Sequence, residues 1–89
     1  MLKRKARFKL QELNQYEEAK KVIKTLYNKE LTKKELINIL KFSEKKLLNA
    51  LSYLIKHNYI YYSVDYIDNN IIKYHLTIEG IFAECLHLN

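Results

Sequence analysis

The sequence predicts a small, mostly helical α+β domain, in which three helices precede a β-hairpin and a last helix follows it. Apolar residues recur at helical spacing as far as His57, and they alternate at strand spacing from Tyr59 to Thr77. The chain has no proline and one glycine in 89 residues, so nearly every residue is expected in an element or a short turn. A chain of this length buries about 60% of its unfolded surface, which allows one compact core.

The first helix is predicted over about residues 15–28. Asn14 lies three residues before Glu17, which is the spacing of a capping box at a helix N-terminus. Behind this box, apolar residues recur at helical spacing at Tyr16, Ala19, Ile23 and Leu26.

A second, shorter helix is predicted over about residues 33–41. Thr32 and Glu35 form a clearer capping box at its start. Leu31, just before the cap, is expected to pack as a hydrophobic staple.

The third helix is expected to follow after a three-residue break, with Ser43 as its N-cap and His57 at its end. Asn58 is expected to close it, because asparagine tolerates the left-handed conformation that often ends a helix. Its apolar face consists of Leu47, Ala50, Leu51 and Leu54.

The spacing of apolar residues changes to that of strands at Tyr59. Residues 59–66 and 71–77 are rich in β-branched and aromatic residues, and the Asp-Asn-Asn cluster at 68–70 is typical of a turn. We therefore expect a β-hairpin. Thr77 is the expected N-cap of a last helix, whose apolar residues are Ile78, Ile81, Phe82, Cys85 and Leu86.

Two short helices joined by a tight turn, with a two-stranded hairpin after the second, form a winged helix-turn-helix. Residues 43–60, S-E-K-K-L-L-N-A-L-S-Y-L-I-K-H-N-Y-I, resemble the recognition helix and first wing strand of MarR-type winged-helix regulators. Residues 74–80, Y-H-L-T-I-E-G, are similar to the Y-x-L-T-x-x-G that closes the wing in that family. The resemblance covers residues 15–88, in the style of small regulators from archaea and their viruses.

The charge of the chain is unevenly distributed. Sixteen Lys and Arg residues against ten Asp and Glu residues give a net charge of +6. Five basic residues against one acidic residue give residues 1–14 a charge of +4, and six against three give residues 29–46 a charge of +3. Residues 59–89 carry one lysine against four acidic residues, a charge of −3. This asymmetry indicates an anionic partner on one side, such as nucleic acid or a membrane surface.

Several classes of protein are disfavoured by the sequence. No apolar run approaches the ~18–20 residues of a membrane span, and the basic N-terminus lacks the apolar segment of a secretory signal. The single cysteine cannot form an intrachain disulfide, so we expect a cytoplasmic protein. The sequence has no zinc-site spacing, glycine-rich phosphate loop or nucleophile triad, so we expect no metal, cofactor, small-molecule ligand or enzymatic activity.

The third helix carries the residues that we expect to read DNA bases. In a helix-turn-helix the second helix enters the major groove, where lysine donates to guanine and asparagine pairs with adenine. Spacings of three and four place a polar set opposite the apolar face, and by the resemblance these match the reading positions of the family. The set is Lys45, Lys46, Asn49 and Tyr53.

The expected phosphate contacts surround this helix, because the helix before it crosses the DNA backbone. They are Lys33, Lys34, Lys41, Lys56, Arg4, Arg7, Asn69, Asn70 and Lys73. The wing departs from the family pattern, since its tip carries Asp65 and Asp68 where phosphate-binding wings have Arg or Lys. The wing therefore contacts DNA through Asn69 and Asn70 or does not contact it.

Residues 1–14 are expected to form a basic arm or a short helix, and residues 15–89 the winged-helix domain. In MarR-like proteins the terminal helices form the dimer, so the resemblance implies a homodimer. The residues expected in its interface are Phe8, Leu10, Leu13, Ile81, Phe82, Cys85 and Leu86. The sequence leaves open whether Cys85 forms an intersubunit disulfide or remains an inert, buried thiol.

The predicted function is sequence-specific binding of double-stranded DNA by a homodimeric transcription regulator, a repressor rather than an activator. One alternative is a winged-helix protein-interaction module within a transcription or replication assembly, which would use the acidic wing and the last helix. Another is binding of anionic membranes by residues 1–14. We favour DNA over both and expect no membrane partner.

Overall fold

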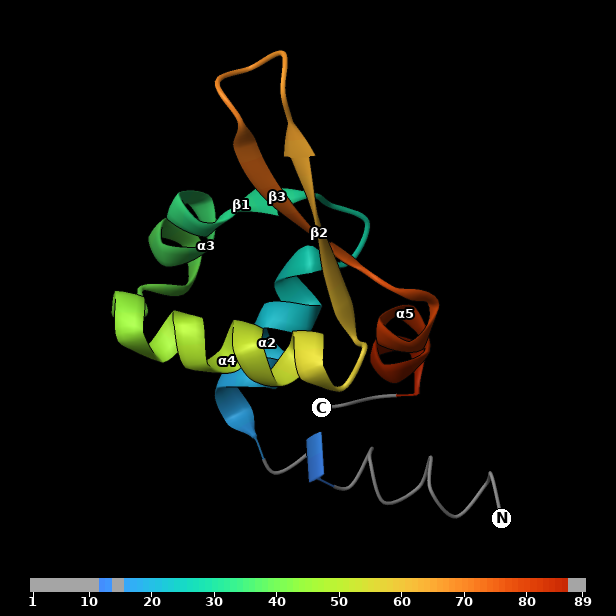
Figure 1. The fold of residues 1–89 in the computed structure, drawn as a ribbon. Helices are drawn as coiled ribbons and strands as arrows, with labels where there is room; N and C mark the ends of the chain where they lie inside the picture. The colour runs from blue at the N-terminus through green and yellow to red at the C-terminus, as the bar shows by residue number, and fades with distance from the viewer. Residues whose placement is uncertain (1–11, 14–15, 87–89) are drawn as a thin grey trace.

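The computed structural model of the chain describes residues 12–13 and 16–86. Its elements are α2 Glu17–Leu26, β1 Leu31–Thr32, α3 Lys33–Leu40, α4 Glu44–Lys56, β2 Ile60–Asp65, β3 Ile71–Leu76 and α5 Ile78–Cys85. Figure 1 shows α3 and α4 next to each other, the β2–β3 hairpin projecting beyond the helices, and α5 on the opposite side from α3. The predicted order of helices and hairpin is confirmed.

Helix α2 lies within the predicted range but is shorter at both ends. Tyr16 is its N-cap and makes no side-chain capping hydrogen bond. Asn14, which was expected in a capping box, lies outside the described residues. The chain leaves the helix at Tyr27, whose backbone is extended, and Asn28 then takes a positive φ of 59°.

Helices α3 and α4 begin at the predicted caps. The Thr32 hydroxyl accepts a hydrogen bond from the Glu35 backbone N–H, and the Glu35 carboxylate accepts one from Thr32 N–H at 2.9 Å. The Ser43 hydroxyl accepts from the Lys46 N–H at 3.1 Å. Between the two helices, Lys41 takes a left-handed conformation with φ 59°. The turn therefore uses a lysine where glycine is more usual.

The sheet contains one strand that the sequence did not predict. Strand β1 pairs antiparallel with β3, so the strand order is β1-β3-β2. Leu31 lies opposite Tyr74 in this pairing, and Leu31 is buried. A two-residue strand is too short to show alternation, and it forms because the outer edge of β3 offers backbone groups for pairing.

The tip of the hairpin is a hydrogen-bonded turn, as the Asp-Asn-Asn cluster predicts. The Asp65 carboxylate accepts hydrogen bonds from the N–H groups of Ile67, at 3.0 Å, and Asp68, at 3.2 Å. Asn69 and Asn70 both have positive φ, which asparagine tolerates better than most residues. Asp65 is therefore part of the turn structure.

The junction of α4, β2 and α5 is tightly packed. Asn58 ends α4 with a φ of 64°, as expected, and its carbonyl accepts a hydrogen bond from the Thr77 hydroxyl at 2.6 Å. That hydroxyl also caps α5 by accepting from the Gly80 N–H. Gly80 lies so close to the Tyr59 carbonyl oxygen that a Cβ there would overlap it.

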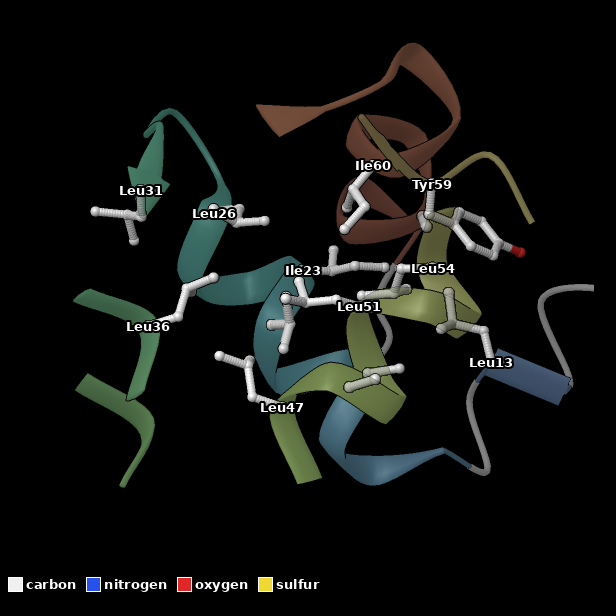
Figure 2. Close-up of a cluster of buried hydrophobic side chains, with 14 residues drawn as sticks. Leu13, Ile23, Leu26, Leu31, Leu36, Leu47, Leu51, Leu54, Tyr59 and Ile60 are labelled. Carbon is white, nitrogen blue, oxygen red and sulfur yellow. The ribbon is translucent and has the colours of Figure 1, made fainter. Parts of the chain in front are cut away.

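The core is one cluster, to which α2 and α4 contribute most of the side chains (Figure 2). Ile23, Leu51 and Leu54 lie at its centre, and Ile60 joins them from β2. Leu13, which was expected at a dimer interface, is fully buried in this core. That prediction is wrong, because Leu13 fills its own protomer's interior and presents no surface to a second copy.

Candidate nucleic-acid interface

Helix α4 presents a polar face opposite its buried side chains. The buried positions are Leu47, Ala50, Leu51 and Leu54. Lys45, Asn49 and Lys56 lie on the other side and are exposed, as the helical period requires. An exposed row of two cations and one amide suits a surface that meets phosphates and base edges.

Lys46 and Tyr53 lie at one side of this polar face, next to α2. The Lys46 ammonium is 5.7 Å from the centre of the Phe42 ring, an attractive cation–π contact. The Tyr53 ring packs against Tyr16, at 4.8 Å, and against His57, at 4.4 Å, between ring centroids. Lys46 remains exposed to solvent.

The burial of Tyr53 bears on its expected role as a base reader. Burial raises the pKa of its hydroxyl to about 12, with a smaller contribution from the nearby Glu12 carboxylate. Packing between the Tyr16 and His57 rings fixes the Tyr53 side chain within the domain. Its position therefore favours a packing role over base reading, and Lys45, Lys46 and Asn49 remain as the exposed members of the predicted set.

An ion pair joins the starts of α3 and α4. The Lys33 ammonium lies 3.0 Å from a Glu44 carboxylate oxygen. Such exposed pairs contribute about 1 kcal/mol at most, but this one neutralises one of the lysines expected to bind phosphate. Lys34, in the first turn of α3, and Lys41, in the turn between α3 and α4, are both exposed. They are better placed than Lys33 to meet the DNA backbone.

The base of the wing holds a polar cluster that the sequence did not reveal. A Glu30 carboxylate oxygen lies 3.5 Å from the Lys73 ammonium, and the other lies 3.4 Å from His75 Nδ1. His75 Nε2 is 2.7 Å from the Ser63 hydroxyl, and the ring stacks on Tyr61 at 4.8 Å. Lys73, expected at a phosphate, therefore faces a carboxylate.

Strand parity was the signal that could have located this cluster. In the β2–β3 pairing, Ser63 lies opposite Lys73 and Tyr61 opposite His75, so all four share one face. Sequence reasoning found no serine, histidine and carboxylate arrangement, whereas the structure brings Ser63, His75 and Glu30 together. These contacts join β2 and β3 to the residue before β1, and they hold the wing against the body of the domain.

The tip of the wing is apolar as well as acidic. Tyr66 is 81% exposed and Ile67 is 99% exposed. Asn69 and Asn70, the expected phosphate contacts, are also exposed there. The Asp65 carboxylate accepts hydrogen bonds from backbone N–H groups of the turn. Asp68 is therefore the acidic side chain at the tip that is available to contact a partner.

A scan against models of known protein families found no match, and neither did a search of curated protein sequences. Solved structures do match. The chain is similar to the adhesin competence repressor AdcR of Streptococcus pyogenes, with a TM-score of 0.73 at 20% identity, over 79% of this chain and 52% of that one. It is also similar to a mutant of Lactococcus lactis ZitR, with a TM-score of 0.74 at 20% identity, over 80% and 49%.

A third match is S. aureus MepR, whose structure was solved as a complex with DNA. Its TM-score is 0.71 at 26% identity, over 85% of this chain and 67% of that one. The fold is a winged helix-turn-helix of the MarR type. The chain spans about half the length of AdcR and ZitR, so it corresponds to part of those winged-helix proteins.

The winged-helix domain leaves an apolar surface on α5. Among the expected interface residues, Ile81 is 45% exposed, Phe82 is 61% exposed and Leu86 is 61% exposed, and Cys85 is an exposed free thiol. The hydroxyl of Tyr27 lies 4.0 Å from the Cys85 sulfur. The remaining residues predicted for the interface or for phosphate contact lie outside the described residues, and they are Arg4, Arg7, Phe8 and Leu10.

Other kinds of site were searched for in residues 12–13 and 16–86. No helix in these ranges is long and apolar enough to cross a membrane. Nor do these residues bring three His, Cys, Asp or Glu side chains together in a group that could hold a metal ion. Between α2 and α4 there is a hollow of about 300 Å³, lined by Tyr16, Glu18, Ser43, Lys45, Lys46 and Asn49.

Proposed function

We propose that the protein is a transcription regulator that binds double-stranded DNA in a sequence-specific manner as a homodimer, and that it acts as a repressor. The exposed polar face of α4 is the observation that carries this proposal. It is supported by the similarity to MepR, which was solved with DNA, and to AdcR, which is named as a repressor. On this proposal the protein works in the cytoplasm and catalyses no reaction.

The proposed mechanism places α4 of each subunit in successive major grooves, about 34 Å apart, on a pseudo-palindromic site. Lys45, Lys46 and Asn49 meet base edges near the start of the helix. Lys34 and Lys41, from α3 and the turn after it, meet phosphates and set the register without reading sequence. Occupying a promoter in this way is enough to repress it.

The first test is fluorescence anisotropy of a labelled mixed-sequence duplex, titrated with the protein at low and moderate salt. We expect the affinity to fall steeply with salt, because each phosphate contact releases counterions. The double variant Lys45→Ala, Lys46→Ala should bind more weakly and should flatten the slope of log K against log salt, because it removes two positive charges from the groove.

The matched control is Lys21→Ala, Lys24→Ala, which removes the same charge from exposed positions on α2. We expect this control to keep nearly the wild-type affinity and slope. Equal losses in both double variants would mean that net charge alone governs binding, and the assignment of α4 as the interface would be wrong.

The exposed wing tip favours a second candidate, a protein-interaction module within a transcription or replication assembly. Tyr66 and Ile67 project from the tip beside Asp68, a composition that suits a partner with apolar and basic residues. Absence of duplex binding at ~50 mM salt, together with capture of a defined partner that Ile67→Asp abolishes, would favour this candidate over DNA binding.

A further inference from the structure

Leu48 is an apolar side chain on the face proposed to meet DNA. It is 42% exposed, although Leu47 and Leu51 on the same helix are buried. With 100° between successive residues, positions 45, 49, 52 and 56 lie opposite the core. Positions 46 and 53 then lie on one flank of the polar face, and positions 48 and 55 on the other.

The two flanks of α4 have different surroundings. The flank with Tyr53 packs against Tyr16, and Lys46 borders the hollow between the two helices. Figure 1 shows α4 lying across α2, and these contacts identify the flank of α4 that lies next to the start of α2. Leu48 and Ile55 are on the flank turned away from α2, where both are partly exposed.

The position of Leu48 along the helix is also informative. It lies in the second turn of α4, and recognition helices contact base edges through their N-terminal turns. A helical side chain leans toward the helix N-terminus, so Leu48 covers surface beside Lys45. Ile55 is seven residues farther along, about 10 Å from the turn of Leu48.

In the major groove, the C5-methyl of thymine is the apolar group presented by base edges, and apolar side chains contact it. Adenine, its partner, is the base that asparagine pairs with best, and Asn49 is next to Leu48. We propose that Leu48 reads thymine by contacting its C5-methyl, so that the preferred site holds an A·T pair at the second turn of α4. This inference rests on the proposed function.

The test compares two duplexes that differ only in these methyl groups. One is a short alternating dA–dT duplex, and the other has deoxyuridine in place of every thymidine. By fluorescence anisotropy, the wild-type protein should bind the deoxyuridine duplex about fourfold more weakly for each methyl that it contacts. The variant Leu48→Ala should bind both duplexes equally, with the wild-type affinity for the deoxyuridine duplex.

Ile55→Ala is the matched control, because Ile55 has nearly the same exposure on the same flank. It should keep the wild-type preference for thymine. Equal wild-type affinities for the two duplexes, or a preference that survives Leu48→Ala, would overturn thymine reading while DNA binding stands. If neither duplex binds at low salt, the proposed function fails and this inference fails with it.

Discussion

At the scale of single residues, Gly80 shows how one missing side chain lets two elements meet. It is the only glycine in the chain, and it lies where α5 crosses the start of β2. A Cβ would overlap the Tyr59 carbonyl oxygen and lie 3.2 Å from Leu76 Cδ2. Any residue could adopt the helical backbone conformation of Gly80. Glycine is therefore needed because it lets α5 approach the Tyr59 carbonyl closely.

We expect Gly80→Ala to destabilise the protein by about 3 kcal/mol, even though alanine is the better helix former. The cost arises because the atom that must move is a backbone oxygen, which accepts a hydrogen bond from Thr77 N–H. Urea unfolding monitored by circular dichroism measures this change. Glu79→Ala, at the exposed neighbouring position, should change stability by less than about 0.5 kcal/mol. A comparably small effect of Gly80→Ala would contradict the packing described here.

At the scale of elements, the capping box of α3 couples the helix-turn-helix to pH. Hydrogen bonds from the backbone and the hydroxyl of Thr32 hold the pKa of the Glu35 carboxyl below its ordinary value of 4.5. A carboxyl group whose pKa is lowered in the folded state stabilises the fold when the pH is above the ordinary pKa of that group. That contribution is lost as the pH falls through the lowered pKa.

We therefore expect Glu35→Gln to flatten the pH dependence of stability below about pH 4.5. Glutamine keeps an oxygen that accepts from Thr32 N–H but does not titrate. Thermal unfolding from neutral to acidic pH compares the two proteins, and the gap between their midpoints should narrow as the pH falls. A constant gap would show that the Glu35 carboxylate is not hydrogen-bonded in the folded protein.

At the scale of the whole molecule, the surface of α5 bears on assembly. Phe82 is 61% exposed, and Ile81, Cys85 and Leu86 extend the same apolar surface. Contiguous apolar surface of this kind marks an interaction site more often than scattered exposed residues do. A second copy of the chain is the occupant that the proposed dimeric mechanism requires.

We expect Phe82→Asp to convert the proposed dimer to a monomer and to weaken DNA binding by at least tenfold, because the two α4 helices would no longer be joined. Size-exclusion chromatography with light scattering reports the mass, and anisotropy reports the binding. Ile67→Asp places the same charge on another exposed apolar residue, and it should leave the protein dimeric. A wild-type protein that elutes as a monomer at micromolar concentration would rule out this role for α5.

Much of the local structure could be predicted from the sequence because its causes are local. Thr32, Ser43 and Thr77 cap the helices that follow them, and each bond spans three residues. The core faces of α2 and α4 follow from the helical period, and the hairpin turn follows from the Asp-Asn-Asn cluster. The exposure of Lys45, Lys46 and Asn49 followed from the same period, whereas their contact with DNA stays a prediction.

The contacts between these elements could be seen only in the tertiary structure. Strand β1 forms because β3 passes beside Leu31, and Leu13 belongs to the same buried cluster as side chains of α2 and α4. The pairs of Lys33 with Glu44 and of Lys73 with Glu30 join residues far apart in sequence. No periodicity encodes such contacts, since they depend on how whole elements pack. The sequence by itself therefore determined the helices, the hairpin and their exposed faces, whereas packing determined strand β1 and which side chains remain free to meet a partner.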